Sequence, residues 1–152
     1  MTVSARLAEL GIELPAVAAP VASYVPAVVH AGLVYTSGQL PFSGGALPTT
    51  GKVGAEVTAE DANLYARTCA LNALAAAADA AGGVDRIAGV LKLGGFVAST
   101  PEFTGQPGVI NGASEVLGEI FGEAGRHARA AVGVPVLPLD SPVEVEVVFI
   151  LA

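Results

Sequence analysis

The segment with the clearest chemical potential lies at residues 125–134, where two basic side chains stand in a short apolar run. Only seven of the 152 residues are Lys or Arg. Arg129 is surrounded by alanines, so its planar fork of N–H donors could bind a carboxylate or phosphate through two parallel hydrogen bonds. The alternative is an ion pair between Arg129 and a carboxylate of the same chain. The segment predicts one of these two arrangements.

A second segment, Tyr35–Pro41, has the pattern of a strand that ends in a loop rich in Gly and Pro. Within it, Ser37 provides a hydroxyl group and Gly38 provides backbone that no side chain covers. Such a pair could border a bound ligand. Ser37 could equally do no more than end the strand, because serine is common in turns.

Together with Tyr24, Asn111 and Glu144, these two segments resemble the Rid (YjgF) family of reactive-intermediate deaminases, also labelled endoribonuclease L-PSP. The resemblance runs from about Ser23 to Phe149. Its most specific parts are the run Ser-Gly-Gln-Leu-Pro and the run Ala-Arg-x-x-Val-x-Val followed by Leu-Pro. It implies an α+β, chorismate-mutase-like fold with a mixed β-sheet, and subunits that assemble as homotrimers with clefts between them.

Members of that family hydrolyse enamines and imines to 2-keto acids and ammonia. By resemblance, Arg129 would bind the carboxylate of a small-molecule substrate, Ser37 and Gly38 would border its imine end, and Glu144 would help to orient water. Tyr24, Asn111 and Ala131 would line the pocket. Many members carry a cysteine at the position of Ala131, so a thiol has no role here. The resemblance implies no cofactor.

Each of these residues also has a simpler interpretation. Tyr24 could fill a core or an interface, Asn111 could lie on a helix surface, and Glu144 could be the ion-pair partner of Arg129. The alternative function is a non-catalytic protein that binds or senses a small molecule in the same cleft. The identity of the substrate depends on loop packing that the residue pattern does not reveal.

The composition restricts the partners that the chain can have. Its formal charge is −7, which disfavours nucleic acid because phosphate binding needs a basic surface. Hydrophobic residues make up 53% and charged residues 14%, so we expect another subunit to cover part of the apolar surface. No uncharged stretch is long enough to predict a membrane span, and we expect a cytoplasmic protein. One cysteine and two distant histidines predict no metal site. We expect His127→Ala to have little effect on the binding of a 2-keto acid.

The pattern of elements predicts an α+β domain with two helices on one face of a sheet. We expect residues 1–20 to form a short helix, capped by Ser4, and the linker Leu14–Pro20, and residues 21–152 to form a single domain. The elements expected in that domain are a hairpin of Tyr24–Val29 and Leu33–Gln39, a helix Ala62–Ala81 capped by Thr58, a strand Gly89–Ala98, a helix from near Pro107 to Phe121, and strands Arg129–Val134 and Val143–Leu151.

Two of these elements carry predictions about which side faces the core. The alternation in Val143–Val147 puts valines on one face and Glu144 and Glu146 on the other. For the long helix, we expect Cys69 to be a small buried residue. Its inward line is predicted to be Leu64, Thr68, Leu71, Ala75 and Ala78. The loop Phe42–Gly54 has a length that often borders a ligand site.

Overall fold

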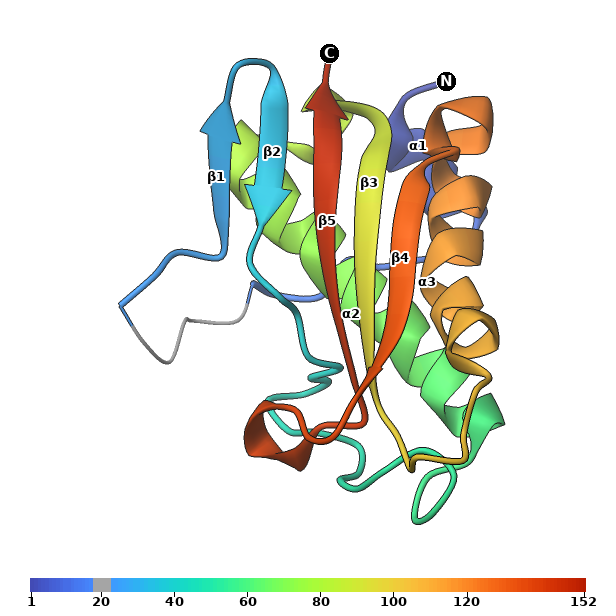
Figure 1. Ribbon diagram of the computed structural model, residues 1–152. Coiled ribbons are helices and arrows are strands. Elements are labelled where there is room, and N and C mark those ends of the chain that lie inside the picture. Colours follow the sequence, from blue (N-terminus) through green and yellow to red (C-terminus); the bar gives the residue numbers. More distant parts are fainter. Residues whose placement is uncertain (18–22) are drawn as a thin grey trace.

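The computed structural model describes residues 1–17 and 23–152 and shows a mixed α+β fold in which helices cover one face of a five-stranded sheet (Figure 1). The sheet order is β1-β2-β5-β3-β4, and only β3 and β4 are parallel. The strands are β1 (Ala27–His30), β2 (Leu33–Thr36), β3 (Ile87–Ala98), β4 (Ala128–Val134) and β5 (Val143–Leu151). The helices are α1 (Val3–Glu9), α2 (Ala59–Ala81) and α3 (Gln106–Phe121), with short 3₁₀ turns η1 (Val84–Arg86), η2 (Gly122–Gly125) and η3 (Pro138–Asp140).

The first two strands form the predicted hairpin, although both are shorter than expected. Ala31 and Gly32 connect them with φ angles of 50° and 78°, the left-handed pair of a tight hairpin turn. Tyr24 and Pro26 lie before β1 rather than in it. In the strand order of the sheet, β1 forms one edge and β4 forms the other.

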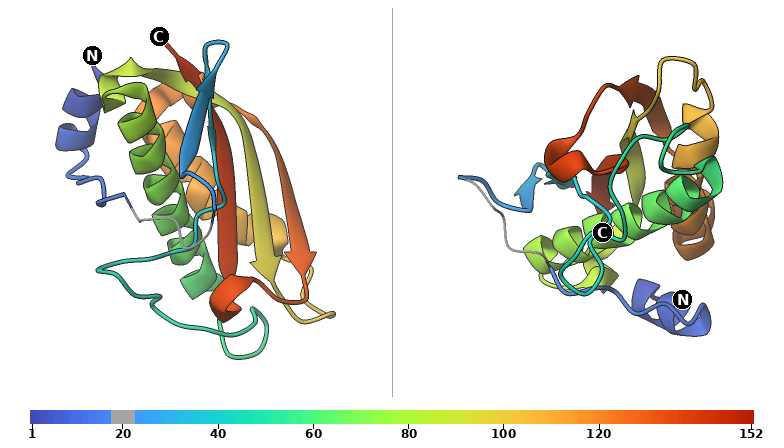
Figure 2. Two further views of the ribbon diagram at one scale, coloured as in Figure 1. Left: turned by 90° about the vertical axis from the view of Figure 1, so that its left-hand side faces the viewer. Right: turned by 90° about the horizontal axis from the view of Figure 1, so that it is seen from below.

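Strand β5 lies in the centre of the sheet and shows the predicted alternation. Val143, Val145 and Val147 are buried under the helices, whereas Glu144 and Glu146 lie on the other face. Both α2 and α3 are on the valine side (Figure 2). We call the helix-free side the open face; it includes the exposed side chains of Val28, Tyr35 and Val132.

Helix α2 has the predicted N-cap and ends at the predicted residue, Ala81. Thr58 is the N-cap and accepts a hydrogen bond from the N–H of Asp61, and Gly82 ends the helix at φ 84°. The predicted inward line was wrong in part, because Leu64 is 59% exposed. Leu74 is the one large side chain on the buried side. The other buried residues are small and let the helix lie close to the sheet: Ala62, Ala66, Cys69, Ala70, Ala73, Ala75, Ala76 and Ala77.

Helix α3 packs against α2 and β3 through two glycines that have no room for a side chain. A Cβ atom on Gly112 would lie 2.0 Å from the backbone oxygen of Asn63 in α2. A Cβ on Gly95 of β3 would lie 2.5 Å from the side chain of Ile110 in α3. Gly95 therefore provides close approach rather than a bulge; the irregular register of β3 lies earlier, between Ile87 and Lys92.

The N-terminal helix packs on the helical layer. Its N-cap is Thr2 rather than the predicted Ser4, whose hydroxyl and N–H bind the carboxylate of Asp85 instead. Leu7 is buried. The end of the predicted linker and the predicted boundary between residues 20 and 21 lie outside the described residues.

Candidate functional site

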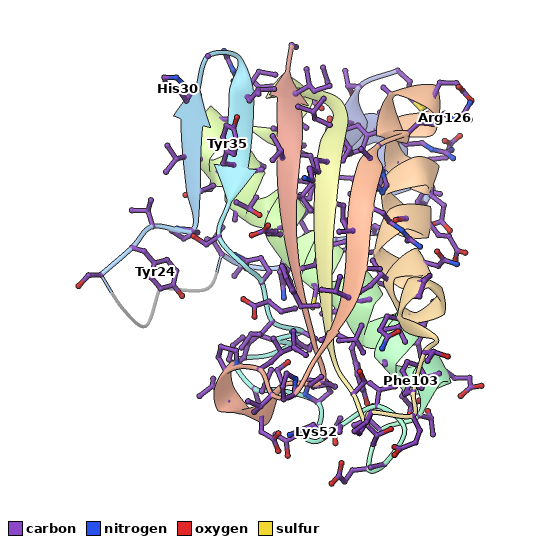
Figure 3. The ribbon with its side chains drawn as sticks, viewed as in Figure 1. Tyr24, His30, Tyr35, Lys52, Phe103 and Arg126 are labelled. Carbon is purple, nitrogen blue, oxygen red and sulfur yellow. The ribbon has the colours of Figure 1, made fainter. Side chains whose placement is uncertain are left out.

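The predicted site residues are distributed over both edges and both faces of the sheet. Tyr24 precedes edge strand β1, while Arg129 lies in the opposite edge strand β4. Figure 3 shows the same separation between the labelled Tyr24 and Arg126, which lies just before β4. One copy of the chain therefore keeps these two parts of the predicted site apart.

Arg129 lies on the helix-bearing side of β4 and contacts α3. It pairs in register with the fully buried Leu93, which sets the side of the sheet on which it lies. Its Nη1 donates to Ser114 Oγ at 3.0 Å, and its Nη2 donates to the carbonyl of Pro107 at 3.1 Å. Both acceptors are uncharged. Within residues 1–17 and 23–152, no carboxylate forms an ion pair with Arg129.

A shallow groove of about 390 Å³ runs between α3 and the start of β4. Its lining includes Asn111, Ser114, His127 and Arg129. Asn111 and Arg129, two of the predicted site residues, are therefore neighbours along one surface. Because it is lined by an arginine, an amide and a hydroxyl, the groove can bind an anion with several hydrogen-bond acceptors.

A second group forms where β2 ends beside β5. The backbone of Gly38 lies against the Glu144 carboxylate so closely that a Cβ there would be 2.0 Å from Oε1. Gln39 exchanges two backbone hydrogen bonds with Val145 and so holds this segment on β5. The Ser37 hydroxyl donates to the carbonyl of Val25 at 2.6 Å. The Glu144 carboxylate therefore occupies space that a side chain at position 38 would fill.

Glu144 is a partly buried carboxylate on the open face. Burial raises the pKa of the Glu144 carboxyl above its ordinary value, and the negative charge of Glu146 adds to the shift. A carboxylate with a raised pKa can accept and return a proton nearer to neutral pH than an ordinary glutamate can. Glu144 is the one carboxylate among the predicted site residues, and this shift favours proton exchange at its carboxyl group.

Glu144 and Arg129 lie on opposite faces of the sheet. Glu144 pairs in register with Phe96, on the open face, whereas Arg129 pairs with Leu93, on the helix-bearing face. The interpretation that Glu144 is the ion-pair partner of Arg129 is therefore wrong within one copy of the chain.

The two remaining predicted residues have different surroundings. Ala131 is on the same side of β4 as Arg129 and packs against the core between the strands and α3. Tyr24 is 48% exposed. Tyr24 is thus available to contact another molecule.

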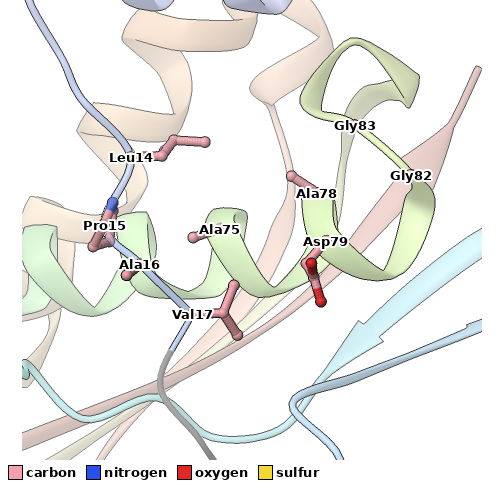
Figure 4. Close-up of a pocket in the computed structure, with 9 residues that line it drawn as sticks. All are labelled: Leu14, Pro15, Ala16, Val17, Ala75, Ala78, Asp79, Gly82 and Gly83. Atoms are coloured by element: carbon pink, nitrogen blue, oxygen red, sulfur yellow. The ribbon is translucent and has the colours of Figure 1, made fainter.

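Larger hollows lie away from these groups, and two of them border α2. One, of about 430 Å³, lies between Leu14–Val17 and the end of α2, and Asp79 is its single charged residue (Figure 4). The other, of about 840 Å³, is bordered by Phe42–Gly45 of the predicted ligand-site loop, with Leu71 and Asn72 of α2. The Asn72 amide donates to the carbonyls of Leu40 and Phe42 and so fixes the start of that loop. None of the predicted site residues lines either hollow.

Residues 1–17 and 23–152 include no group of three or more His, Cys, Asp and Glu side chains that could hold a metal ion. The same part of the chain has no helix that is both long and apolar enough to cross a membrane. Cys69 is fully buried in α2, and burial raises the pKa of its thiol well above the ordinary value.

The sequence did not predict Ser114 and His127 as site residues. Ser114 accepts a hydrogen bond from Arg129, and His127 is hydrogen-bonded to Ser114. Ser114 Oγ lies 2.9 Å from Nε2 of His127, and Nδ1 of His127 lies 2.6 Å from the carbonyl oxygen of Gly125. Ser114 and His127 are 13 residues apart and belong to different elements. The sequence gives one signal only, the placement of His127 two positions before Arg129.

Comparisons with known proteins agree on one family. Residues 4–152 match the sequence model of the family described as YjgF/chorismate mutase-like, putative endoribonuclease. The chain is 46% identical over 147 residues to Protein TCP17 of Trypanosoma cruzi, with 95% of this chain and 91% of that protein covered.

Solved structures show the same similarity. Protein Atu1372 of Agrobacterium tumefaciens, described as of unknown function, is 44% identical with a TM-score of 0.90, covering 99% of this chain and 92% of that one. A putative endoribonuclease of Shewanella oneidensis is 37% identical with a TM-score of 0.94, covering 99% of this chain and 100% of that one.

Proposed function

The chain belongs to the YjgF/chorismate mutase-like family, and from that premise we propose that it is a deaminase that hydrolyses reactive 2-imino acids, or the enamines in equilibrium with them, to 2-keto acids and ammonia. The resemblance of its Ser37–Pro41 and Arg129 segments to Rid deaminases suggests the reaction. The contacts and charges around those residues support it.

The main support for this function is that the guanidinium group of Arg129 is held in place without an ion-pair partner among the described residues. Its guanidinium group is fixed by two uncharged acceptors, Ser114 Oγ and the Pro107 carbonyl, and it has no ion-pair partner in the described part of the chain. The second N–H of each terminal nitrogen and the N–H of Nε remain for a ligand. A positioned cation that no carboxylate of the described residues neutralises suits the carboxylate of a 2-imino acid.

The reaction itself needs one water and one proton acceptor. The oxygen of water adds to the imine carbon, the nitrogen takes up protons, and the carbon–nitrogen bond then breaks to release ammonia and leave a 2-keto acid. Glu144 is the group that orients the water and moves its proton, and its raised pKa brings that exchange closer to neutral pH. Ser37 and Gly38 border the imine end, while Asn111, Ala131 and Tyr24 line the pocket.

These groups form one site only if copies of the chain meet. Arg129 and Asn111 lie at the β4 edge, whereas Tyr24, Ser37 and Gly38 lie toward the β1–β2 edge. We infer that the β4 edge of one copy adjoins the β1–β2 edge of the next, which would bring the two groups toward each other. We propose a homotrimer, which gives three such sites and covers apolar side chains of the open face such as Val28 and Val132.

The proposed activity is tested with 2-imino acids generated in situ by an amino-acid oxidase. Wild-type protein should remove the imine faster than it decays spontaneously, with aliphatic, sulfur-containing and aromatic substrates compared. Arg129→Ala and Arg129→Lys should both lose about 10- to 100-fold in affinity for a 2-keto acid such as pyruvate, because one charge-assisted pair contributes about 1.5–3 kcal/mol. Lysine fails to rescue because its ammonium group lacks the two-pronged geometry.

Arg86→Ala is the control, because it removes the same charge from an exposed position in η1. It should match wild type in both assays. Binding of pyruvate at Arg129 with imine loss at the background rate would favour the alternative, a non-catalytic small-molecule binding or regulatory protein. Equal pyruvate affinity in wild type and a folded Arg129→Ala variant would remove the basis of both functions.

A further inference from the structure

We propose that Ser114 and His127 are positioning residues for Arg129, joined in a hydrogen-bonded relay that fixes the guanidinium group before any ligand binds. The consequence for substrate binding rests on the proposed function. The relay itself is a property of the ligand-free protein. It lies at the contact of α3, η2 and β4, whose neighbouring positions are visible in Figure 1.

The proton positions in the relay follow from the chemistry of its two ends. At one end, the Gly125 carbonyl can only accept, so Nδ1 of His127, 2.6 Å away, carries a proton and donates it. At the other end, Arg129 can only donate, so Ser114 Oγ accepts from Nη1 at 3.0 Å. Between them, in the tautomer of His127 that carries its proton on Nδ1 alone, Nε2 has no proton and the Ser114 hydroxyl donates to it at 2.9 Å. Each hydrogen bond thus runs in one direction, from Arg129 to Gly125.

The surrounding backbone holds both ends of the relay rigidly. Gly125 is buried against α3 at the end of η2, where a Cβ would lie 2.6 Å from the Leu117 carbonyl oxygen. Its carbonyl is therefore fixed relative to α3, the same helix that carries Ser114. Arg129 is anchored a second time by the Pro107 carbonyl in the first turn of α3. Both terminal nitrogens of the guanidinium group are consequently bound to one helix.

A neutral relay differs in effect from an ion pair. Fixing an arginine side chain costs conformational entropy, and the ligand need not supply that cost if the protein already holds the side chain in place. A carboxylate at position 114 would also fix Arg129, but it would neutralise the charge that attracts the ligand. A hydroxyl oriented by a histidine restrains the guanidinium and leaves its charge available. This role differs from the sequence expectation that His127→Ala has little effect.

The relay is tested first without ligand, by NMR of wild type and four variants. Wild-type His127 should show the tautomer protonated at Nδ1 at about pH 8, and the Arg129 Nε–H signal should be sharp and slow to exchange. Ser114→Ala and His127→Ala should broaden that signal or speed its exchange. Ser114→Thr, which keeps the hydroxyl, should restore it. His30→Ala removes the other histidine, at the far edge of the sheet, and should change nothing.

The second test is pyruvate affinity. Ser114→Ala and His127→Ala should each weaken binding about three- to tenfold, as expected for one hydrogen bond of ordinary strength, and Ser114→Thr should bind as wild type does. If wild type binds no 2-keto acid and hydrolyses no imine, the proposed function fails and the NMR result decides the relay alone. An Nε2-protonated His127, or an Arg129 signal that is unaffected in Ser114→Ala and His127→Ala, overturns the relay. Full affinity in both alanine variants overturns its positioning role.

Discussion

Two glycines of the same helix should respond to alanine in opposite ways. In α3, a Cβ on Gly112 would lie 2.0 Å from the backbone oxygen of Asn63, whereas a Cβ on Gly118 would have no atom within 4 Å. Alanine favours a helix over glycine by about 1 kcal/mol. Gly118→Ala should therefore stabilise the protein by about 0.5–1 kcal/mol and raise Tm by about 1–4 °C.

Gly112→Ala should destabilise the protein despite the same gain in helix propensity. Real Cβ atoms essentially never approach another atom within 3.0 Å, so α2 and α3 must separate by about 1 Å, and the obstacle is backbone that cannot rotate away. Such overpacking costs about 3 kcal/mol. After the gain in propensity, the net loss is about 2 kcal/mol, which lowers Tm by about 4–8 °C.

Thermal and urea unfolding, followed by far-UV circular dichroism, measure both variants against wild type. The comparison is internally controlled because both substitutions add one methyl group to the same helix. A Gly112→Ala protein as stable as Gly118→Ala would refute the close contact between α2 and α3. That contact also matters for the site, because Gly112 lies between Asn111 and Ser114 on α3.

Four further outcomes are expected. The raised pKa of Glu144 means that folding disfavours its charged form, so the protein loses stability as the pH rises through that pKa. Glu144→Gln should therefore raise Tm at about pH 7–8 and leave it unchanged below about pH 4. Calorimetry at several pH values measures this difference. Cys69 should resist a thiol reagent in native protein and react once urea unfolds the chain. Light scattering should give about three times the 15.0 kDa chain mass, and a monomer would contradict the proposed shared site. Single-stranded RNA should show no salt-sensitive gel shift at physiological ionic strength, because a net charge of −7 repels phosphate.

Local patterns in the sequence predicted most elements because their causes are local. Thr58 and Gly82 mark the ends of α2 through a side-chain cap and a left-handed backbone position, and both depend on neighbouring residues alone. The alternation around Glu144 likewise assigned the two faces of β5 correctly. The inward side of α2 could not be predicted in the same way, because 11 of its 23 residues are alanine and its faces therefore differ little in hydrophobicity. Leu64 consequently looked like a core residue and is exposed.

The sequence by itself determined which residue types are present for chemistry: an arginine among alanines, a Ser-Gly pair after a strand, and a glutamate on the polar side of a strand. Only the tertiary structure decided how they are arranged. Strand order places Arg129 and Tyr24 at opposite edges, and register places Arg129 and Glu144 on opposite faces. The hydrogen bonds of Ser114 with Arg129 and with His127 arise because α3, η2 and β4 pack together. Such packing depends on the burial of side chains distant in sequence, which a pattern of neighbouring residues does not encode.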